Sequence, residues 1–119
     1  MGRVKKVLVL VRRSPLNSVK NAEALRQSVG LTLAENEITV LFIDAGAWLS
    51  VPLSPEIIAG GQIGKHIDAL IMLQARLRVE GESLDSYGID RAQVIDGIEI
   101  VSEEDVAAEI TSADAVIPF

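Results

Sequence analysis

Short apolar runs alternate along this chain with longer segments in which apolar residues recur every three or four positions. The run Val4–Val11 is rich in Val and Leu and is too short for a helix, which is typical of a strand buried on both faces of a parallel sheet. Helical spacing follows from Ser18 to Glu35, and Ile38–Ile43 is a second buried strand. This order predicts a βαβ unit with a right-handed crossover.

The rest of the chain continues the alternation. It predicts a short helix that begins at Ser54 and ends at Gly60 and Gly61, and then a longer helix over Gln62–Leu73. A strand over Arg76–Glu80, a helical turn over Ser83–Tyr87 and a strand over Ile98–Val101 are predicted next. The last elements are a helix that starts at a Ser102–Asp105 capping box and buries Val106 and Ile110, and a final strand over Ala113–Phe119. Strands interleaved with helices predict an α/β domain with a mainly parallel five-stranded sheet. The length predicts a single domain over residues 1–119.

Composition excludes several function classes. The 119 residues contain no Cys, which excludes a disulfide framework, a zinc-thiolate site, a Cys nucleophile and a persulfide carrier. A formal charge of -6 and 3% aromatic residues disfavour nucleic acid and anionic membranes as partners. No apolar run approaches the ~18 residues that span a bilayer, and no secretory signal is evident, so we expect a cytoplasmic protein.

The segment after the first strand is a candidate anion-binding loop. Ligands of open α/β sheets bind outside the carboxyl ends of the strands, where Arg12, Arg13, Ser14 and Asn17 combine two guanidiniums with polar groups before a helix. The alternative is that Ser14 or Asn17 caps the helix and that the arginines form surface ion pairs.

Acidic residues follow the strand Arg76–Glu80. Glu80, Glu82 and Asp85 form a candidate site for acid/base chemistry or a divalent cation, and the alternative is a solvated loop. His66 is the only His, and a lone His lacks the further ligands that a metal needs. We therefore expect no resident metal and no cofactor.

An apolar stretch with few polar neighbours lies after the second strand. Trp48, Leu49, Val51 and Leu53 form a candidate subunit contact, because exposed apolar patches commonly mark such contacts. The alternative is that this segment folds onto its own core.

Four stretches in the second half of the chain carry a resemblance to a known family. They are Val79–Leu84, Gly88–Asp90, Ser102–Asp105 and Ala113–Phe119. Together with the Lys-Lys-Val-Leu-Val-Leu-Val and Val-Leu-Phe-Ile-Asp strands of the first half, they resemble the DsrE/DsrF superfamily, most closely its DsrF/TusC branch. The resemblance covers nearly the whole chain and implies a three-layer α/β/α fold.

The resemblance also implies a functional setting. Such proteins form trimers or hexamers, either from one chain or from DsrE-, DsrF- and DsrH-like chains (TusD-, TusC- and TusB-like), and these assemblies relay sulfane sulfur as a persulfide. The carrier is a Cys just after the family's fourth strand, a position that falls on or next to Glu80 here. A carboxylate cannot hold the sulfur, so we expect a DsrF/TusC-like subunit without carrier or catalytic function. The alternative is a homo-oligomer that binds or converts a small anion.

Overall fold

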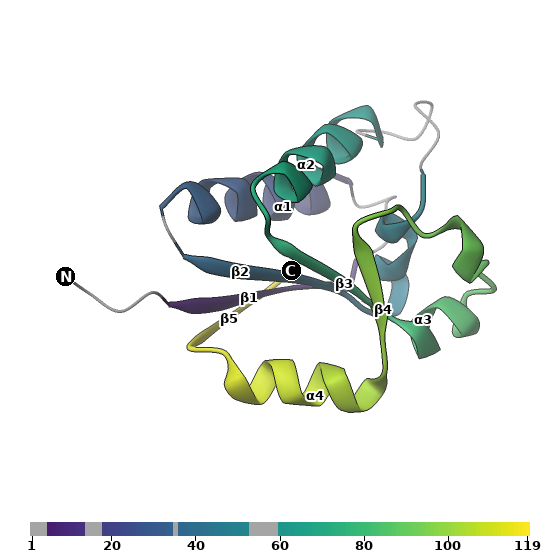
Figure 1. The fold of residues 1–119 in the computed structure, drawn as a ribbon. Helices are drawn as coiled ribbons and strands as arrows, with labels where there is room; N and C mark the ends of the chain where they lie inside the picture. Colours follow the sequence, from purple (N-terminus) through teal and green to yellow (C-terminus); the bar gives the residue numbers. More distant parts are fainter. Residues whose placement is uncertain (1–4, 14–17, 35, 53–59) are drawn as a thin grey trace.

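Five strands form one sheet at the centre of the molecule, and every pairing in it is parallel (Figure 1). The computed structural model describes residues 5–13, 18–34, 36–52 and 60–119. The strands are β1 (Lys6–Val11), β2 (Glu37–Phe42), β3 (Arg76–Glu80), β4 (Ile98–Val101) and β5 (Ala115–Pro118). Their order across the sheet is β4-β3-β2-β1-β5. The predicted five-stranded parallel sheet is therefore confirmed.

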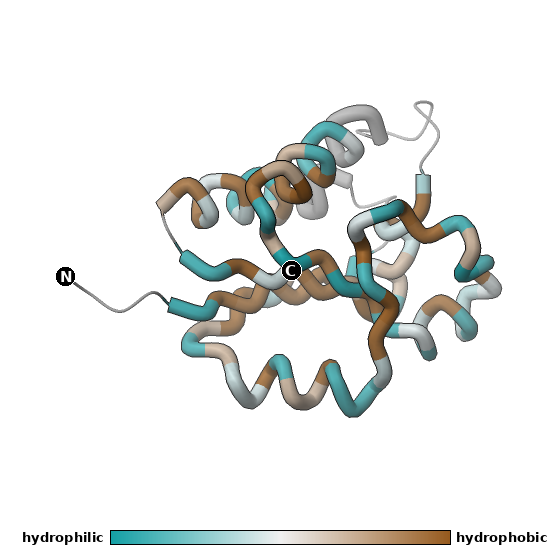
Figure 2. The backbone as a smooth tube through the Cα atoms, viewed as in Figure 1, coloured by the Kyte–Doolittle hydropathy of each residue, from teal (hydrophilic) through white to brown (hydrophobic). Residues whose placement is uncertain are grey.

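The two strands with continuous apolar runs lie near the middle of the sheet. In β1 and β2 only the first residue is exposed and the next five are buried. Each has neighbours on both sides and layers above and below, so both of its faces need apolar side chains. Figure 2 shows the resulting concentration of hydrophobic positions along the central strands. The two-sided burial predicted from the sequence is confirmed.

Helices cover both faces of the sheet and make it the middle of three layers. Helices α1 (Ser18–Leu33) and α2 (Gly60–Met72) lie on one face, and α4 (Glu103–Ser112) lies on the other, while α3 (Gly81–Ser86) follows the carboxyl end of β3 (Figure 1). The smaller core cluster, on the α4 side, contains Leu8, Leu10, Leu41, Val101 and Val106. None of these helices, as far as the structure describes them, is long and apolar enough to cross a membrane.

Three details differ from the sequence prediction. Gly60 and Gly61 begin α2, and the short helix that was predicted to start at Ser54 lies outside the described residues. Residues 44–50 form a 3-10 helix, η2 (Asp44–Ser50), and Arg91–Gln93 forms another, η3. Ile110 is exposed although its spacing predicts burial. In this turn of α4 the residue that faces the sheet is its neighbour Glu109, which pairs with Arg78 of β3.

The capping box that begins α4 is confirmed. The Ser102 hydroxyl accepts a hydrogen bond from the Asp105 backbone N–H at 3.1 Å, and the Asp105 carboxylate accepts one from the Ser102 backbone N–H at 3.2 Å. These hydrogen bonds lower the pKa of Asp105 below its usual value. The cap fixes where the chain turns from β4 into the helix that crosses beneath the sheet.

An ion-pair network joins β3, β4 and α4 beneath the sheet. The Arg78 guanidinium donates to Glu99 at 2.6 and 3.0 Å and also pairs with Glu109. The side chains of Arg78 and Glu109 are each only 13% exposed. A charge that keeps so little contact with water requires a partner, so the network binds α4 to the sheet.

Replacing Arg78 by Met is expected to lower the free energy of unfolding by about 2 kcal/mol. The substitution leaves the Glu109 carboxylate largely buried, with only Arg76 at 3.3 Å to balance its charge. Urea denaturation followed by circular dichroism measures the effect. The control is Arg26→Met, which removes an exposed ion pair with Glu23 and is expected to leave the midpoint unchanged. Equal midpoints for the two variants would contradict the prediction.

Candidate functional site

The carboxyl ends of β1, β2 and β3 meet at one edge of the sheet. Because the strands are parallel, Arg12 after β1, Asp44 after β2 and Glu80 at the end of β3 all lie along this edge. This is the edge at which open α/β sheets hold ligands. Two of the candidates predicted from the sequence, Arg12 and Glu80, thus lie at the same edge of the sheet, on strands that β2 separates.

Glu80 belongs to a short chain of hydrogen bonds across this edge. The Ser83 hydroxyl donates to the Glu80 carboxylate at 2.6 Å and accepts from the Asp44 backbone N–H at 2.8 Å. Ser83 is 4% exposed, whereas Glu80 is half-buried. These two hydrogen bonds therefore hold the turn after β3 against the turn after β2.

The turn after β2 is tightly constrained. Asp44 has a φ of 51°, in the left-handed region that few residues other than Gly adopt. Two residues later, Gly46 packs on the end of β1, where an added Cβ would lie 2.1 Å from the Val11 carbonyl oxygen. Such constraints hold the Asp44 N–H in the position from which it donates to Ser83.

Arg91 covers the first residue of α3. An added Cβ on Gly81 would lie 2.8 Å from an Arg91 guanidinium nitrogen, so only Gly leaves room for this approach. The guanidinium also donates to Asp85 at 2.9 and 3.2 Å, and these hydrogen bonds lower the pKa of Asp85 below its usual value. A cation therefore lies one residue from Glu80.

The candidate cation site is not assembled. Glu80 accepts from Ser83, Asp85 pairs with Arg91, and Glu82 is exposed. Within the described ranges no group of three or more His, Cys, Asp or Glu residues is placed to hold a metal ion. His66 is half-buried on α2.

The candidate anion loop is described only in part. Arg12 and Arg13 are exposed, and together with Glu23, Gln27, Pro118 and Phe119 they line an open cavity of about 480 Å³. Arg13 has an interaction partner of its own. The other two residues of this candidate, Ser14 and Asn17, lie outside the described residues.

The candidate subunit contact requires a correction. Leu49 and Val51 are buried in the core of the chain itself, because η2 folds back onto the sheet, so they do not present an apolar surface. Trp48, on the other side of the same helix, is 37% exposed. Leu53 lies outside the described residues. Trp48 is thus the described member of this group that lies at the surface.

Sequence reasoning missed Ser83, Asp44 and Arg91 as parts of the site. Their contacts span 39 residues for Asp44 and Ser83 and six residues for Arg91 and Asp85. Only the arrangement of the strands brings the first pair together. A usable signal was Gly81 directly after the strand, since Gly at such a point often marks a close approach. Glu80 ends β3, the third strand in chain order, whereas the resemblance implies a carrier after the family's fourth strand.

Comparison with known proteins gives a consistent picture. The sequence profile of the DsrE/DsrF-like family matches residues 5–119. The fold is similar to the crystal structure of the YchN protein from E. coli, with a TM-score of 0.82, 20% identity and coverage of 98% of this chain and 100% of that one. It is also similar to MTH1491 of Methanobacterium thermoautotrophicum, a protein of unknown function, with a TM-score of 0.69, 16% identity and coverage of 98% and 100%. No functionally curated protein matches the sequence.

Proposed function

Because the chain belongs to the DsrE/DsrF-like family, we propose that it is a DsrF/TusC-like subunit of a cytoplasmic sulfur-relay assembly and does not carry the sulfur. DsrE- and DsrH-like (TusD- and TusB-like) chains are the expected partners, and one of them would supply the thiol. The observation behind the proposal is the absence of Cys from all 119 residues of a member of this family. Only a thiolate forms the persulfide that such a relay requires.

The environment of Glu80 supports a structural role at the position where the resemblance implies the carrier. Its carboxylate accepts a hydrogen bond from Ser83, which in turn holds the turn after β2. The group therefore stabilises the edge of the sheet. The Ser83 hydroxyl that pairs with this carboxylate is 4% exposed, and its oxygen already accepts the Asp44 N–H, which favours a structural role over that of a nucleophile.

Co-purification tests the proposal. The chain is expressed together with a Cys-bearing DsrE-like chain of the same organism, and the intact assembly is weighed by native mass spectrometry. The sample is then treated with inorganic polysulfide, and each chain is weighed separately. We expect a mixed assembly in which only the partner gains sulfane sulfur. Failure of the two chains to associate, or a sulfane adduct on this chain, would contradict the proposal.

A homo-oligomer that binds a small anion is the second candidate function. The observation that favours it is the open cavity at Arg12. Phosphate is a suitable probe, and titration of the chain alone is compared with titration of its Arg12→Gln variant. Saturable phosphate binding that depends on Arg12, in a chain that assembles only with itself, would favour this function over the first.

Both functions require assembly, and Trp48 is the residue through which we test it. Trp48→Asp is expected to weaken self- or partner association at least tenfold, because burying an unpaired charge in a contact is unfavourable. Trp48→Phe is the control, since it keeps most of the apolar area. Native mass spectrometry at micromolar concentration measures both variants. An unchanged assembly in Trp48→Asp would exclude Trp48 from the contact.

A further inference from the structure

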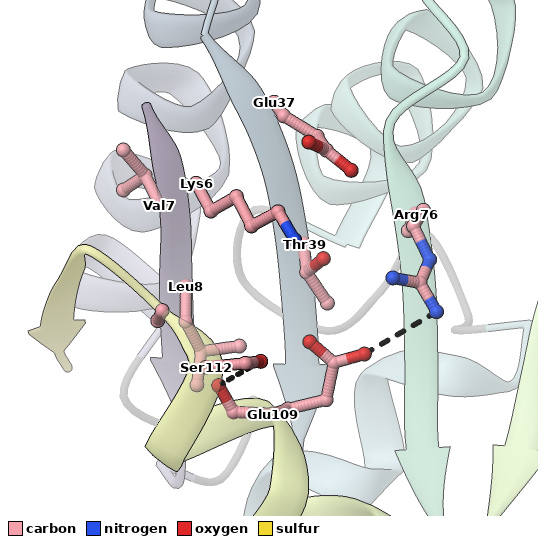
Figure 3. Close-up of a pocket in the computed structure, with 9 residues that line it drawn as sticks. Lys6, Val7, Leu8, Glu37, Thr39, Arg76, Glu109 and Ser112 are labelled. Atoms are coloured by element: carbon pink, nitrogen blue, oxygen red, sulfur yellow. Dashed lines mark hydrogen bonds and ion pairs between the residues drawn. The ribbon is translucent and has the colours of Figure 1, made fainter. Parts of the chain in front are cut away.

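A second cavity lies at the opposite edge of the sheet from Glu80. It has a volume of about 70 Å³ and lies between the amino ends of β1, β2 and β3 and the end of α4 (Figure 3). The first residues of all three strands line it. Its polar lining consists of Lys6, Glu37, Thr39, Arg76, Glu109 and Ser112.

Thr39 gives the strongest indication that the cavity holds a ligand. The residue is only 6% exposed and lines the cavity, yet its hydroxyl has no hydrogen-bond partner among the residues that the structure describes. Buried hydroxyl groups are rarely left without a partner, because the lost hydrogen bonds to water must be replaced. The hydroxyl is therefore available to a molecule in the cavity.

Charged groups of both signs accompany this hydroxyl. The Lys6 ammonium and the Glu37 carboxylate have no ion pair or hydrogen bond with the described part of the chain, and Figure 3 shows both side chains extending over the same space as Thr39. Within the described ranges, Arg76 pairs only with Glu109, at 3.3 Å. Glu109 is in turn neutralised by Arg78 from beneath the sheet. Among the described residues, the Lys6 ammonium, the Thr39 hydroxyl and the Glu37 carboxylate are thus without a partner, and Arg76 keeps N–H groups that its pair with Glu109 does not use.

We propose that this cavity binds a small zwitterion of the amino-acid class. The carboxylate of the ligand accepts hydrogen bonds from Thr39 and from the cations Lys6 and Arg76, while its ammonium group pairs with Glu37. An ion of one sign fits less well, because two cations and two carboxylates line the cavity. The volume is that of about two water molecules in the liquid, so the cavity suits the main-chain atoms of an amino acid, with any side chain at the open mouth.

Nuclear magnetic resonance of the full ¹⁵N-labelled chain tests the proposal with glycine as the probe. Acetate and ethylammonium carry one half of the zwitterion each and serve as matched probes. We expect saturable shifts of the Lys6, Thr39 and Arg76 amide signals with a Kd in the millimolar range for glycine, and binding at least tenfold weaker for each single-charge probe. No saturable shift with glycine, or equal binding of acetate, would overturn the proposal.

Two variants separate this site from a general surface effect. Thr39→Val keeps the shape and the β-branch of the side chain and is expected to weaken glycine binding about tenfold. Its control is Thr32→Val, on α1 at the other face of the sheet, which is expected to bind like the unmodified chain. Glu37→Gln is expected to keep acetate binding and to lose the preference for glycine. Equal losses in the Thr39 and Thr32 variants, or an unchanged preference in Glu37→Gln, would contradict the assignment. These measurements need no partner chain and no sulfur, so their outcome is independent of the proposed relay function.

Discussion

Replacing Gly46 by Ala is expected to lower the free energy of unfolding by about 3 kcal/mol or more, the largest effect on stability that we anticipate from a single methyl group. The added Cβ would lie 2.1 Å from the Val11 carbonyl oxygen and 2.8 Å from its carbon. Both are backbone atoms of a strand that is buried in the sheet, so no flexible side chain can move away. That carbonyl also accepts the Ile43 N–H at 3.0 Å, and a shift would break this hydrogen bond.

The same substitution at Gly30 provides the control. Gly30 lies within α1, and a Cβ added there meets nothing within 4 Å, so Gly30→Ala is expected to raise stability by about 0.5–1 kcal/mol. Thermal and urea denaturation measure both variants. Opposite shifts of the two midpoints are the expected result. Similar shifts would show that η2 accommodates a side chain at position 46.

Gly46 is required because of a contact with a residue far away in the sequence, and such contacts are the part of the fold that the sequence does not predict. The strands Lys6–Val11 and Glu37–Phe42 follow from local composition, because each needs only apolar residues that suit both faces. The 3-10 helix that places Gly46 on Val11 has no local pattern of its own. Its position depends on contact with a strand more than 30 residues earlier, as the contact of Gly46 with Val11 shows.

The candidate site divides in the same way. Strand ends can be read from the sequence, so Arg12 and Glu80 were predicted at the carboxyl edge. The bond between Ser83 and the Asp44 N–H depends on β2 and β3 being neighbours, which a single sequence does not state. Thr39 is a further case, because a Thr inside an apolar strand predicts burial but not that the residue lines a cavity.

The largest functional effect is expected from Glu80→Cys, which should convert a chain that accepts no sulfane sulfur into one that accepts it. The introduced thiol would stand at the end of β3, where the family resemblance implies the carrier. The Arg91 guanidinium over Gly81 and the Ser83 hydroxyl lie close by, and a nearby cation favours the thiolate. That thiolate would attack the outer sulfur of a donor persulfide, forming a new S–S bond and releasing the donor thiolate, without net oxidation.

Asp68→Cys is the control, because residue 68 is exposed on α2 and its side chain takes no part in the contacts of Arg91 and Ser83. Alkylation by iodoacetamide as a function of pH gives the pKa of each thiol, and mass spectrometry after incubation with a persulfide donor gives the sulfur taken up. We expect a lower thiol pKa and faster sulfur uptake in Glu80→Cys than in Asp68→Cys. Equal pKa values and equal uptake would mean that the end of β3 supplies no chemistry of its own. In that case the fold would keep the position of the carrier but not the neighbouring groups that activate a thiol there, and the function of this chain would depend on another part of its surface.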